Sequence, residues 1–297
     1  MERLTGELRP GDPRVLGPWR LLGVLGEGGM GVVYLGRGGR RVAAVKTLRP
    51  ELLDEAHFLA RFRRERQAAD ATRHPYLPRL LGADLGGPVP WIATEFVGGP
   101  TLGRCVDDHG PLPEPAVRAL GGMLASALAA LHAAQVVHRD LKPSNVLLAA
   151  DGPRLVDFGI ARLPLATTVT VTGQRPGSPG YMSPEQVLGR ELGPPNDVFT
   201  LGALLVYAST GHPAFGGESS AALDYAIAHE EPDLSRVPPP LAPVLHRCLD
   251  KSPGARPTAE ELAALWSSPA RRPKAAKEWL PRTWPPRSSN GSAERGS

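Results

Sequence analysis

Short hydrophobic runs separated by glycine-rich turns dominate the first third of the chain. The runs WRLLGVLG, VVYLG, RVAAVKTL and WIATEFV have the residue types of β-strands. One charged segment among them, at about residues 56–72, has a helical pattern and precedes a His-Pro pair. Together these features predict an antiparallel sheet with one helix packed on it over residues 19–97.

Helical periodicity dominates after residue 100. The longest apolar stretch, residues 119–137, contains His132 and has leucines at helical spacing, so it is interpreted as a buried helix and not as a membrane span. Proline-rich breaks separate several of the predicted helices. The helices are expected at residues 115–135, 183–189, 197–210, 218–229, 241–250 and 258–266.

Residues 136–159, VVHRDLKPSNVLLAADGPRLVDFG, carry the most informative polar groups. Asp140 is followed by Lys142 two residues on, Asn145 five residues on and Asp157 seventeen residues on. A base, a cation and two oxygen ligands for a hard metal ion are the groups that phosphoryl transfer requires. The tripeptides HRD and DFG could each be an ordinary turn by themselves. Their order, their spacing and the KPSN between them favour a catalytic centre.

The glycine-rich segment LGEGGMGVV, residues 25–33, lies in the first predicted hairpin. Its glycines allow the backbone to approach phosphate oxygens closely. No helix begins after it, which excludes a dinucleotide-binding turn. Lys46 follows in the apolar strand AAVK and needs an anionic partner if it is buried. Glu65 in RFRRERQAAD is the candidate partner; the alternatives are a surface lysine and a solvated glutamate.

Composition places the chain among ordinary globular proteins, with 41% hydrophobic and 22% charged residues in 297. The net charge of +4 comes from a Pro/Arg/Ser-rich tail, so we expect no binding to nucleic acid. Two cysteines, Cys105 and Cys248, and no signal or membrane-spanning pattern predict a cytoplasmic protein without a transmembrane segment. A Pro-rich stretch in the tail could be a polyproline ligand or a spacer.

Taken together, G-x-G-x-x-G-x-V, A-x-K, H-R-D-L-K-P-x-N, D-F-G and S-P-E are the signature set of protein kinases. Over residues 19–266 the chain resembles the bacterial eukaryotic-like (Hanks-type) serine/threonine protein kinases. The resemblance implies an α+β, bilobal kinase fold, with a small antiparallel-sheet N-lobe carrying one helix and a larger, mainly helical C-lobe. The expected domains are a flexible lead-in at 1–18, a kinase domain at 19–267 (N-lobe 19–97, C-lobe 98–267) and a disordered basic tail at 268–297.

The resemblance also implies a role for each motif residue. Asp140 would accept the proton of the substrate hydroxyl, Lys142 would approach the transferred phosphate, and Lys46 paired with Glu65 would hold the α- and β-phosphates of ATP. Asn145 and Asp157 would bind Mg²⁺. The expected ATP-binding residues are Leu25, Gly26, Glu27, Gly28, Gly29, Met30, Gly31, Val32, Val33, Ala44, Lys46, Thr94, Glu95, Val97 and Leu147, with Thr94 at the back of the pocket.

The threonine-rich segment after Asp157 resembles a kinase activation loop. Thr170 and Thr172 match the usual phosphorylated positions, and a phosphothreonine there would give Arg139 a counter-charge. This predicts autophosphorylation, which a homodimer could support, in bacterial signalling to protein substrates. Asp197 resembles the helix aspartate that holds the catalytic loop, and Arg256 resembles the arginine that pairs with Glu185.

Two other functions compete with an active protein kinase. A pseudokinase scaffold usually lacks the strand lysine or one of the two motif aspartates, whereas Lys46, Asp140 and Asp157 are all present. A small-molecule phosphotransferase of related fold would have less use for an activation loop and an S-P-E motif, which serve polypeptide docking. Serine or threonine specificity is favoured over tyrosine by Lys142.

Overall fold

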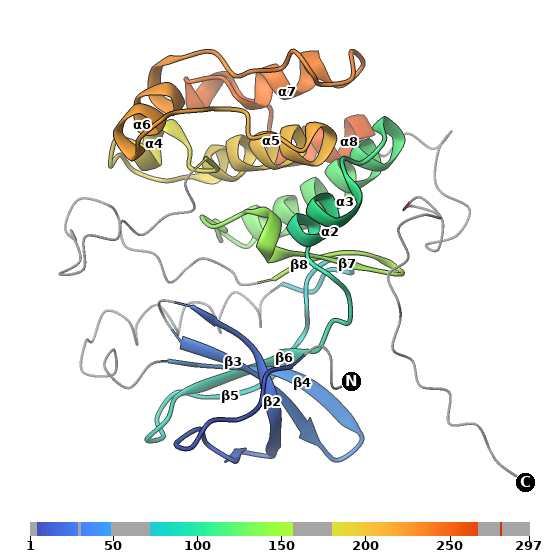
Figure 1. Ribbon diagram of the computed structural model, residues 1–297, viewed down its shortest axis with the longest axis vertical. Coiled ribbons are helices and arrows are strands. Elements are labelled where there is room, and N and C mark those ends of the chain that lie inside the picture. Colours follow the sequence, from blue (N-terminus) through green and yellow to red (C-terminus); the bar gives the residue numbers. More distant parts are fainter. Residues whose placement is uncertain (1–4, 29–30, 49–71, 157–179, 267–279, 281–297) are drawn as a thin grey trace, which may run out of the picture.

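The computed structural model describes residues 5–28, 31–48, 72–156, 180–266 and 280. Within these ranges the chain forms two lobes, a twisted sheet and a group of helices, with a small two-stranded sheet between them (Figure 1). The predicted α+β, bilobal architecture is therefore confirmed. The predicted helix at 56–72 lies outside the described residues except for its last position, and the predicted tail lies outside them except for Leu280.

The N-lobe sheet is antiparallel and has the strand order β1-β2-β3-β4-β6-β5. Its strands pair in register so that alternate side chains form one hydrophobic cluster, which contains Trp19, Tyr34, Val45 and Trp91. The strand bounds are β1 Val15–Leu16, β2 Trp19–Gly28, β3 Gly31–Gly38, β4 Arg41–Leu48, β5 Leu80–Asp84 and β6 Trp91–Glu95. The sequence pattern had not indicated β1 or β5.

Residues 5–18 lie against this sheet, although the sequence had predicted a flexible lead-in at 1–18. Gly6 forms an isolated bridge with Val24 of β2, and Val15 pairs with Arg20 through β1. Gly17, at φ 52°, is needed at its position because a Cβ there would meet the Trp91 ring at 2.4 Å. These contacts make the segment part of the N-lobe.

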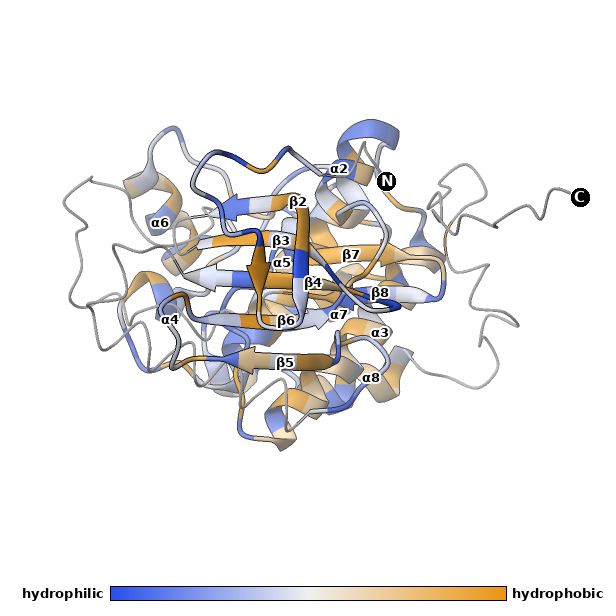
Figure 2. Ribbon diagram, turned by 90° about the horizontal axis from the view of Figure 1, so that it is seen from below, coloured by the Kyte–Doolittle hydropathy of each residue, from blue (hydrophilic) through white to orange (hydrophobic). Residues whose placement is uncertain are grey.

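The two-stranded sheet of β7 (Val146–Ala149) and β8 (Gly152–Leu155) joins the lobes. Leu147 forms a bridge with Thr101, and the amide of Leu148 donates to the carbonyl of Pro100 at 2.9 Å. The segment that connects β6 to the first helix of the C-lobe is therefore held against β7. In Figure 2, which looks onto the N-lobe sheet, β7 and most of β5 are coloured as hydrophobic.

The C-lobe is built around two long helices, α3 (Glu114–Ala133) and α5 (Pro194–Thr210). Leu120, Leu124, Leu128 and Leu131 of α3 are fully buried in the main hydrophobic cluster. The helix α3 is long and apolar enough to cross a membrane, but its burial among the other helices identifies it as a core helix. The other helices are α2 Leu102–His109, α4 Pro184–Val187, α6 Ser220–His229, α7 Ala242–Cys248 and α8 Ala259–Trp266.

Helix α8 packs on α3 through a tryptophan that lies over two glycines. A Cβ on Gly121 would meet the Trp266 ring at 2.5 Å, and one on Gly122 would lie 3.1 Å from the Trp266 Cβ. Both glycines are within α3, where glycine is otherwise unfavourable. The close approach of Trp266 explains their presence.

The predicted helices match the observed ones closely in the C-lobe, with two differences. Helix α5 begins at Pro194, three residues before the predicted start, because proline is accommodated in the first helical turn. Helix α2 was not predicted. It begins after Thr101, whose hydroxyl oxygen accepts a hydrogen bond from the amide of Arg104 at 3.1 Å and caps the helix.

Candidate active site

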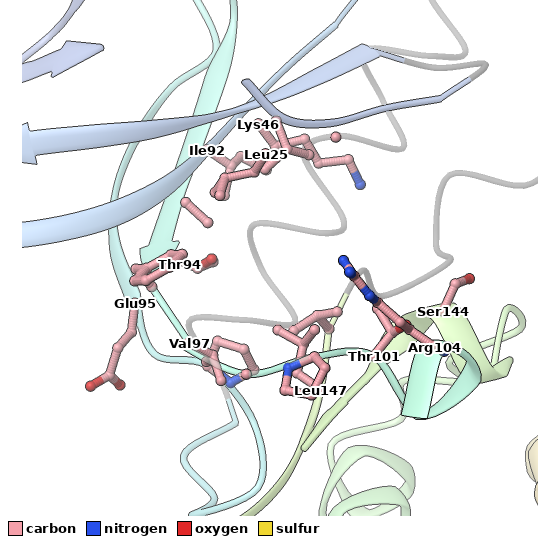
Figure 3. A pocket seen from close by; sticks show the side chains of 18 residues that line it. Leu25, Lys46, Ile92, Thr94, Glu95, Val97, Thr101, Arg104, Ser144 and Leu147 are labelled. Atoms are coloured by element: carbon pink, nitrogen blue, oxygen red, sulfur yellow. The ribbon is translucent and has the colours of Figure 1, made fainter. Parts of the chain in front are cut away.

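A cavity of about 390 Å³ lies between the N-lobe sheet and the β7 region (Figure 3). Its upper wall comes from β2, β3 and β4, its back from β6, and its lower wall from the start of α2 and from β7. Most of the lining is aliphatic, as expected of a pocket for a planar ring system. Of the predicted ATP-binding residues, those that line this cavity are Leu25, Gly26, Val33, Ala44, Lys46, Thr94, Glu95, Val97 and Leu147.

Other predicted residues take different positions. Glu27, Gly28, Gly31 and Val32 belong to β2 and β3 near the turn of the glycine-rich hairpin and are not part of the cavity lining. Gly29 and Met30 lie outside the described residues, as do Glu65, Asp157, Thr170 and Thr172. Their predicted roles stay predictions.

Sequence reasoning missed several lining residues, and Arg104 is the most significant among them. Figure 3 shows Lys46 pointing into the cavity from the sheet and Arg104 pointing into it from α2. Arg104 also forms an exposed ion pair with Asp108 at 3.4 Å. Thr101, an N-cap residue directly before an apolar position, could have located the start of α2 and with it Arg104. The other missed residues are Pro78, Ile92, Phe96, Gly99, Pro100, Thr101, Ser144 and Val156.

The predicted catalytic residues Asp140 and Lys142 and the predicted metal ligand Asn145 lie together in one loop, whose Ser144 lines the cavity. Lys142 Nζ is 3.1 Å from Asp140 Oδ2, and Asn145 Nδ2 donates to the carbonyl oxygen of Asp140 at 2.8 Å and to its Oδ2 at 3.2 Å. Asn145 is buried, and its backbone carbonyl accepts a hydrogen bond from Val156. The asparagine thereby fixes the Asp140 carboxylate next to a cation.

The loop at residues 138–145, which we call the catalytic loop, is held in place by Asp197 of α5. Asp197 Oδ2 accepts from the amide of His138 at 2.7 Å, and Asp197 Oδ1 accepts from the amide of Arg139 at 2.9 Å. His132 of α3 lies 2.8 Å from Oδ2 through its Nε2. Arg139 has the left-handed φ of 65°, which is unfavourable for a residue with a side chain. Asp197 therefore stabilises a loop conformation that the local sequence alone would not favour.

Asp197 is fully buried, yet it remains a carboxylate. Burial by itself raises its pKa, but the hydrogen bond from His132, the neighbouring His138 and the amide of Arg139 outweigh burial and lower the pKa below its usual 3.8. The resemblance to protein kinases had identified Asp197 as the residue that holds this loop. It had not identified the contribution of His132, which lies 65 residues away in the chain.

A second buried network lies beside the first. Arg256 and Glu185 form a two-fold ion pair, with Nη1–Oε1 at 2.6 Å and Nη2–Oε2 at 2.9 Å, as the sequence had suggested. Ser183 caps α4 and donates to Asn196 at 2.8 Å, while the side chain of Gln186 donates to the carbonyl of Arg139 at 3.0 Å. Helix α4 is thus tied to both α5 and the catalytic loop.

The sequence matches the family model described as "Protein kinase domain" over residues 19–266. The serine/threonine-protein kinase AfsK of Streptomyces coelicolor is 43% identical over 286 residues, which cover 94% of this chain and 36% of that protein. The probable serine/threonine-protein kinase PkwA of Thermomonospora curvata is 41% identical over 262 residues, or 88% of this chain and 35% of the relative. The serine/threonine-protein kinase PknB of Mycobacterium leprae is 36% identical over 85% of this chain and 43% of its own length.

The chain spans little more than a third of the length of the first two of these relatives. The family model begins at Trp19, the start of β2, and ends at Trp266, the end of α8. The matched region contains the cavity, the catalytic loop and both buried networks. The chain belongs to the protein kinase domain family, in its bacterial serine/threonine branch.

Proposed function

We propose that this protein is a serine/threonine protein kinase that transfers the γ-phosphate of ATP to hydroxyl groups of protein substrates. One observation supports this most directly: Lys142 and Asn145 both contact the Asp140 carboxylate, and Ser144 of the same loop lines the cavity that Lys46 enters from the sheet. In this proposal Asp140 is the base and Lys46 is the phosphate-binding cation. The kinase names of the relatives support the same reaction class.

The cavity fits ATP in shape and chemistry. Leu25, Val33 and Ala44 on one side and Leu147 on the other form an apolar slot for the purine, and the backbone of residues 95–97 runs along its edge. The cations of Lys46 and Arg104 point into the space beside this slot, where the anionic phosphates would lie (Figure 3). Thr94, at the back, would limit the size of the ring that can enter.

Asp140 would accept the proton of the substrate hydroxyl as the oxygen attacks the γ-phosphorus. The amide of Asn145 holds the Asp140 carboxylate in place, and the ammonium of Lys142, 3.1 Å away, would offset the negative charge of the transferred group. The bond from the γ-phosphorus to the bridging oxygen breaks, ADP leaves, and the proton stays on Asp140 until it is released to solvent. The protein contributes position and charge, without a covalent intermediate.

Mg²⁺ would be held by Asn145 and Asp157, and it would neutralise charge on the phosphates. The side-chain nitrogen of Asn145 is directed at Asp140, so the side-chain oxygen, Oδ1, would bind the metal ion. Asp157 follows the last described residue of this segment, Val156, which lines the cavity. Both residue types suit a hard cation.

Three finer elements also belong to this proposal. Thr170 and Thr172 are autophosphorylation sites, which one copy of the chain phosphorylates on another copy. The phosphate then forms an ion pair with Arg139. The reaction takes place in the cytosol, which both cysteines support because they are unpaired and buried. The partners are ATP and polypeptides.

The decisive test replaces Asp140 with Asn. We expect the rate of phosphorylation of a generic basic protein to fall by a factor of about 10³ or more, with little change in the affinity for ADP. Asp151→Asn, an exposed aspartate in the β7–β8 turn, is the matched control and should retain full activity. Undiminished turnover in the Asp140 variant would contradict the mechanism. A wild-type protein that binds ADP but phosphorylates neither itself nor any protein would instead identify a pseudokinase.

A further inference from the structure

Residues 5–12, which we name the N-terminal strap, lie beside the strand that leads into the glycine-rich hairpin. The amide of Gly6 donates to the carbonyl of Val24 at 2.8 Å, and the amide of Val24 donates back to Gly6 at 2.9 Å. Beyond its short pairing with β1, strand β2 is thus also paired through the strap at this position. Leu8 packs on the N-lobe hydrophobic cluster.

The position of this pairing matters because β2 is irregular there. The pairing of β2 with β3 is interrupted between Leu21 and Gly23 and again between Val24 and Gly26. Irregularities of this kind weaken the hydrogen-bond ladder and let the strand bend. The strap bonds Val24, which lies between the two interruptions. It therefore gives a second partner to the short stretch of β2 that pairs with β3 between the two irregularities.

Gly23 is shaped to receive the strap. A Cβ at this position would lie 2.7 Å from the carbonyl oxygen of Gly6 and 2.8 Å from the Cβ of Thr5. Only a residue without a side chain permits such close contact between two backbone segments. The hairpin sequence is thus adapted to a segment that lies outside the matched kinase region.

Asp12 connects the strap to the rigid part of the sheet. The hydroxyl of Tyr34 on β3 donates to Asp12 Oδ1 at 2.8 Å, and the amide of Arg9 donates to Asp12 Oδ2 at 2.7 Å. The Tyr34 residue is only 3% exposed. Burial, together with the bond to Asp12, raises the pKa of Tyr34 above its usual value, so the hydroxyl stays protonated and keeps donating.

Arg9 connects the strap to the glycine-rich hairpin itself. Its Nη2 donates to Glu27 Oε2 at 2.7 Å, and Glu27 is the neighbour of Gly26, which lines the cavity. A series of contacts thus runs from Tyr34 through Asp12 and Arg9 to Glu27. An uncompensated carboxylate beside a triphosphate would be unfavourable, and the guanidinium offsets its charge.

We propose that Arg9 and Asp12 are positioning residues. Together they hold the glycine-rich hairpin over the nucleotide, and the guanidinium of Arg9 offsets the charge of Glu27. This inference rests on the proposed function, since it takes the cavity to be the ATP site. The strap would act on nucleotide affinity and leave the chemical step, carried by the C-lobe, almost unchanged. The KM for ATP is therefore the quantity that responds.

The expected size of the effect follows from exposure. The side chains of Arg9 and Glu27 are 64% and 32% exposed, and exposed ion pairs change an equilibrium constant by up to about fivefold. For Arg9→Ala we expect the KM for ATP to rise about two- to fivefold, with kcat unchanged within about twofold. Asp12→Ala, which removes the hydrogen bonds from the Tyr34 hydroxyl and from the Arg9 amide, should raise the KM at least as much. Arg9→Lys should restore most of the affinity.

A double-mutant cycle separates positioning from a general loss of stability. With Glu27→Gln in place, Arg9→Ala should have no further effect on the KM, because the charge that Arg9 neutralises is gone. The effect of Arg9→Ala should also vanish in about 1 M salt, where the screening length is about 3 Å. Arg20→Ala, an exposed arginine at the other end of β2, is the matched control and should leave the KM unaltered.

Two measurements keep this test distinct from that of the proposed function. Steady-state kinetics give KM and kcat, and calorimetric titration with a non-hydrolysable ATP analogue gives the Kd without any need for activity. An inactive wild-type protein would contradict the proposed function, while the Kd values would still decide on the strap. The strap inference would be overturned if Arg9→Ala and Asp12→Ala both had the KM and Kd values of the wild type. It would also be overturned if kcat fell by the same factor as the KM rose.

Discussion

The two walls of the cavity are held by different kinds of interaction. The catalytic loop below rests on buried polar groups: Asp197, which binds it, and Arg256, in the neighbouring network, have almost no exposed surface, and Asp197 belongs to α5, a helix of the main core. The glycine-rich hairpin above rests on backbone pairing that is interrupted twice and on ion pairs at the surface, such as Arg9–Glu27. From this difference we expect the lower wall to be more rigid than the upper wall.

This difference matches the two tasks of the site. Proton transfer and phosphate transfer require groups fixed within a fraction of an ångström, which buried and fully hydrogen-bonded networks provide. Nucleotide entry and exit require a wall that can open and close, which a weakly held hairpin permits. Stability and chemistry should therefore be sensitive to changes in the C-lobe, and nucleotide affinity to changes in the N-lobe.

The strongest test of this contrast removes one ion pair from each lobe. Arg256→Ala leaves the buried Glu185 uncompensated, so we expect the free energy of unfolding to fall by about 3–5 kcal/mol. Arg79→Ala removes the exposed Arg79–Glu95 pair of the N-lobe, at 3.3 Å, and should cost about 0.5 kcal/mol or less. Urea unfolding followed by circular dichroism measures both. Equal losses in the two variants would contradict the contrast between the lobes.

The next test concerns the charge on Asp197. Asp197→Asn keeps the shape but weakens the bonds to His138, Arg139 and His132, and we expect a loss of about 1–3 kcal/mol at pH 7. Because its folded-state pKa is depressed below 3.8, the carboxylate contributes its full stability above that pH and loses it as the pH falls through the folded value.

The difference in the free energy of unfolding between wild type and Asp197→Asn should therefore be constant from pH 8 to pH 5. It should become smaller below pH 3.8. Urea titrations at a series of pH values give this difference directly. Asp108→Asn, in an exposed ion pair, serves as the control and should show no such trend. A difference that grows towards low pH would show that Asp197 is not stabilised as a carboxylate.

A test with a smaller effect than Arg256→Ala or Asp197→Asn concerns the boundary between the lobes. Thr101 caps α2 and also lines the cavity, so Thr101→Ala should lower the free energy of unfolding by about 1 kcal/mol. Thr101→Ser retains the hydroxyl oxygen and should be close to wild type. Thermal unfolding of the three proteins checks this order. A serine variant as unstable as the alanine variant would show that the cap contributes little.

The local pattern of the sequence predicted much of the fold. The leucines of α3 recur at helical spacing, so both the helix and its burial followed from the residues alone. The short strand β5, Leu80–Asp84, escaped prediction because its period-2 signal is brief and includes a glycine. Helix α2 escaped because its eight residues mix charged and apolar types.

The site residues that lie within one short motif were predictable from the sequence. The contacts between segments that are far apart in the chain were harder to predict. Asp140, Lys142 and Asn145 lie within six residues, and their spacing alone placed them together. Gln186 supports Arg139 from 47 residues away, and His132 contacts Asp197 from 65 residues away; the sequence indicated neither contact. The strap depends on a glycine at position 23 whose function appears only once Gly6 lies against it. Such long-range contacts follow from the packing of the whole chain.

The packing of Trp266 on Gly121 and Gly122 limits where a fragment of this domain can end. The indole covers backbone that no side chain of α3 covers, so a fragment ending before Trp266 would expose a groove in the central helix. Expression fragments should therefore extend through this residue. The same contact is a natural place for a spectroscopic reporter, since the fluorescence of this indole would register the detachment of α8 from α3.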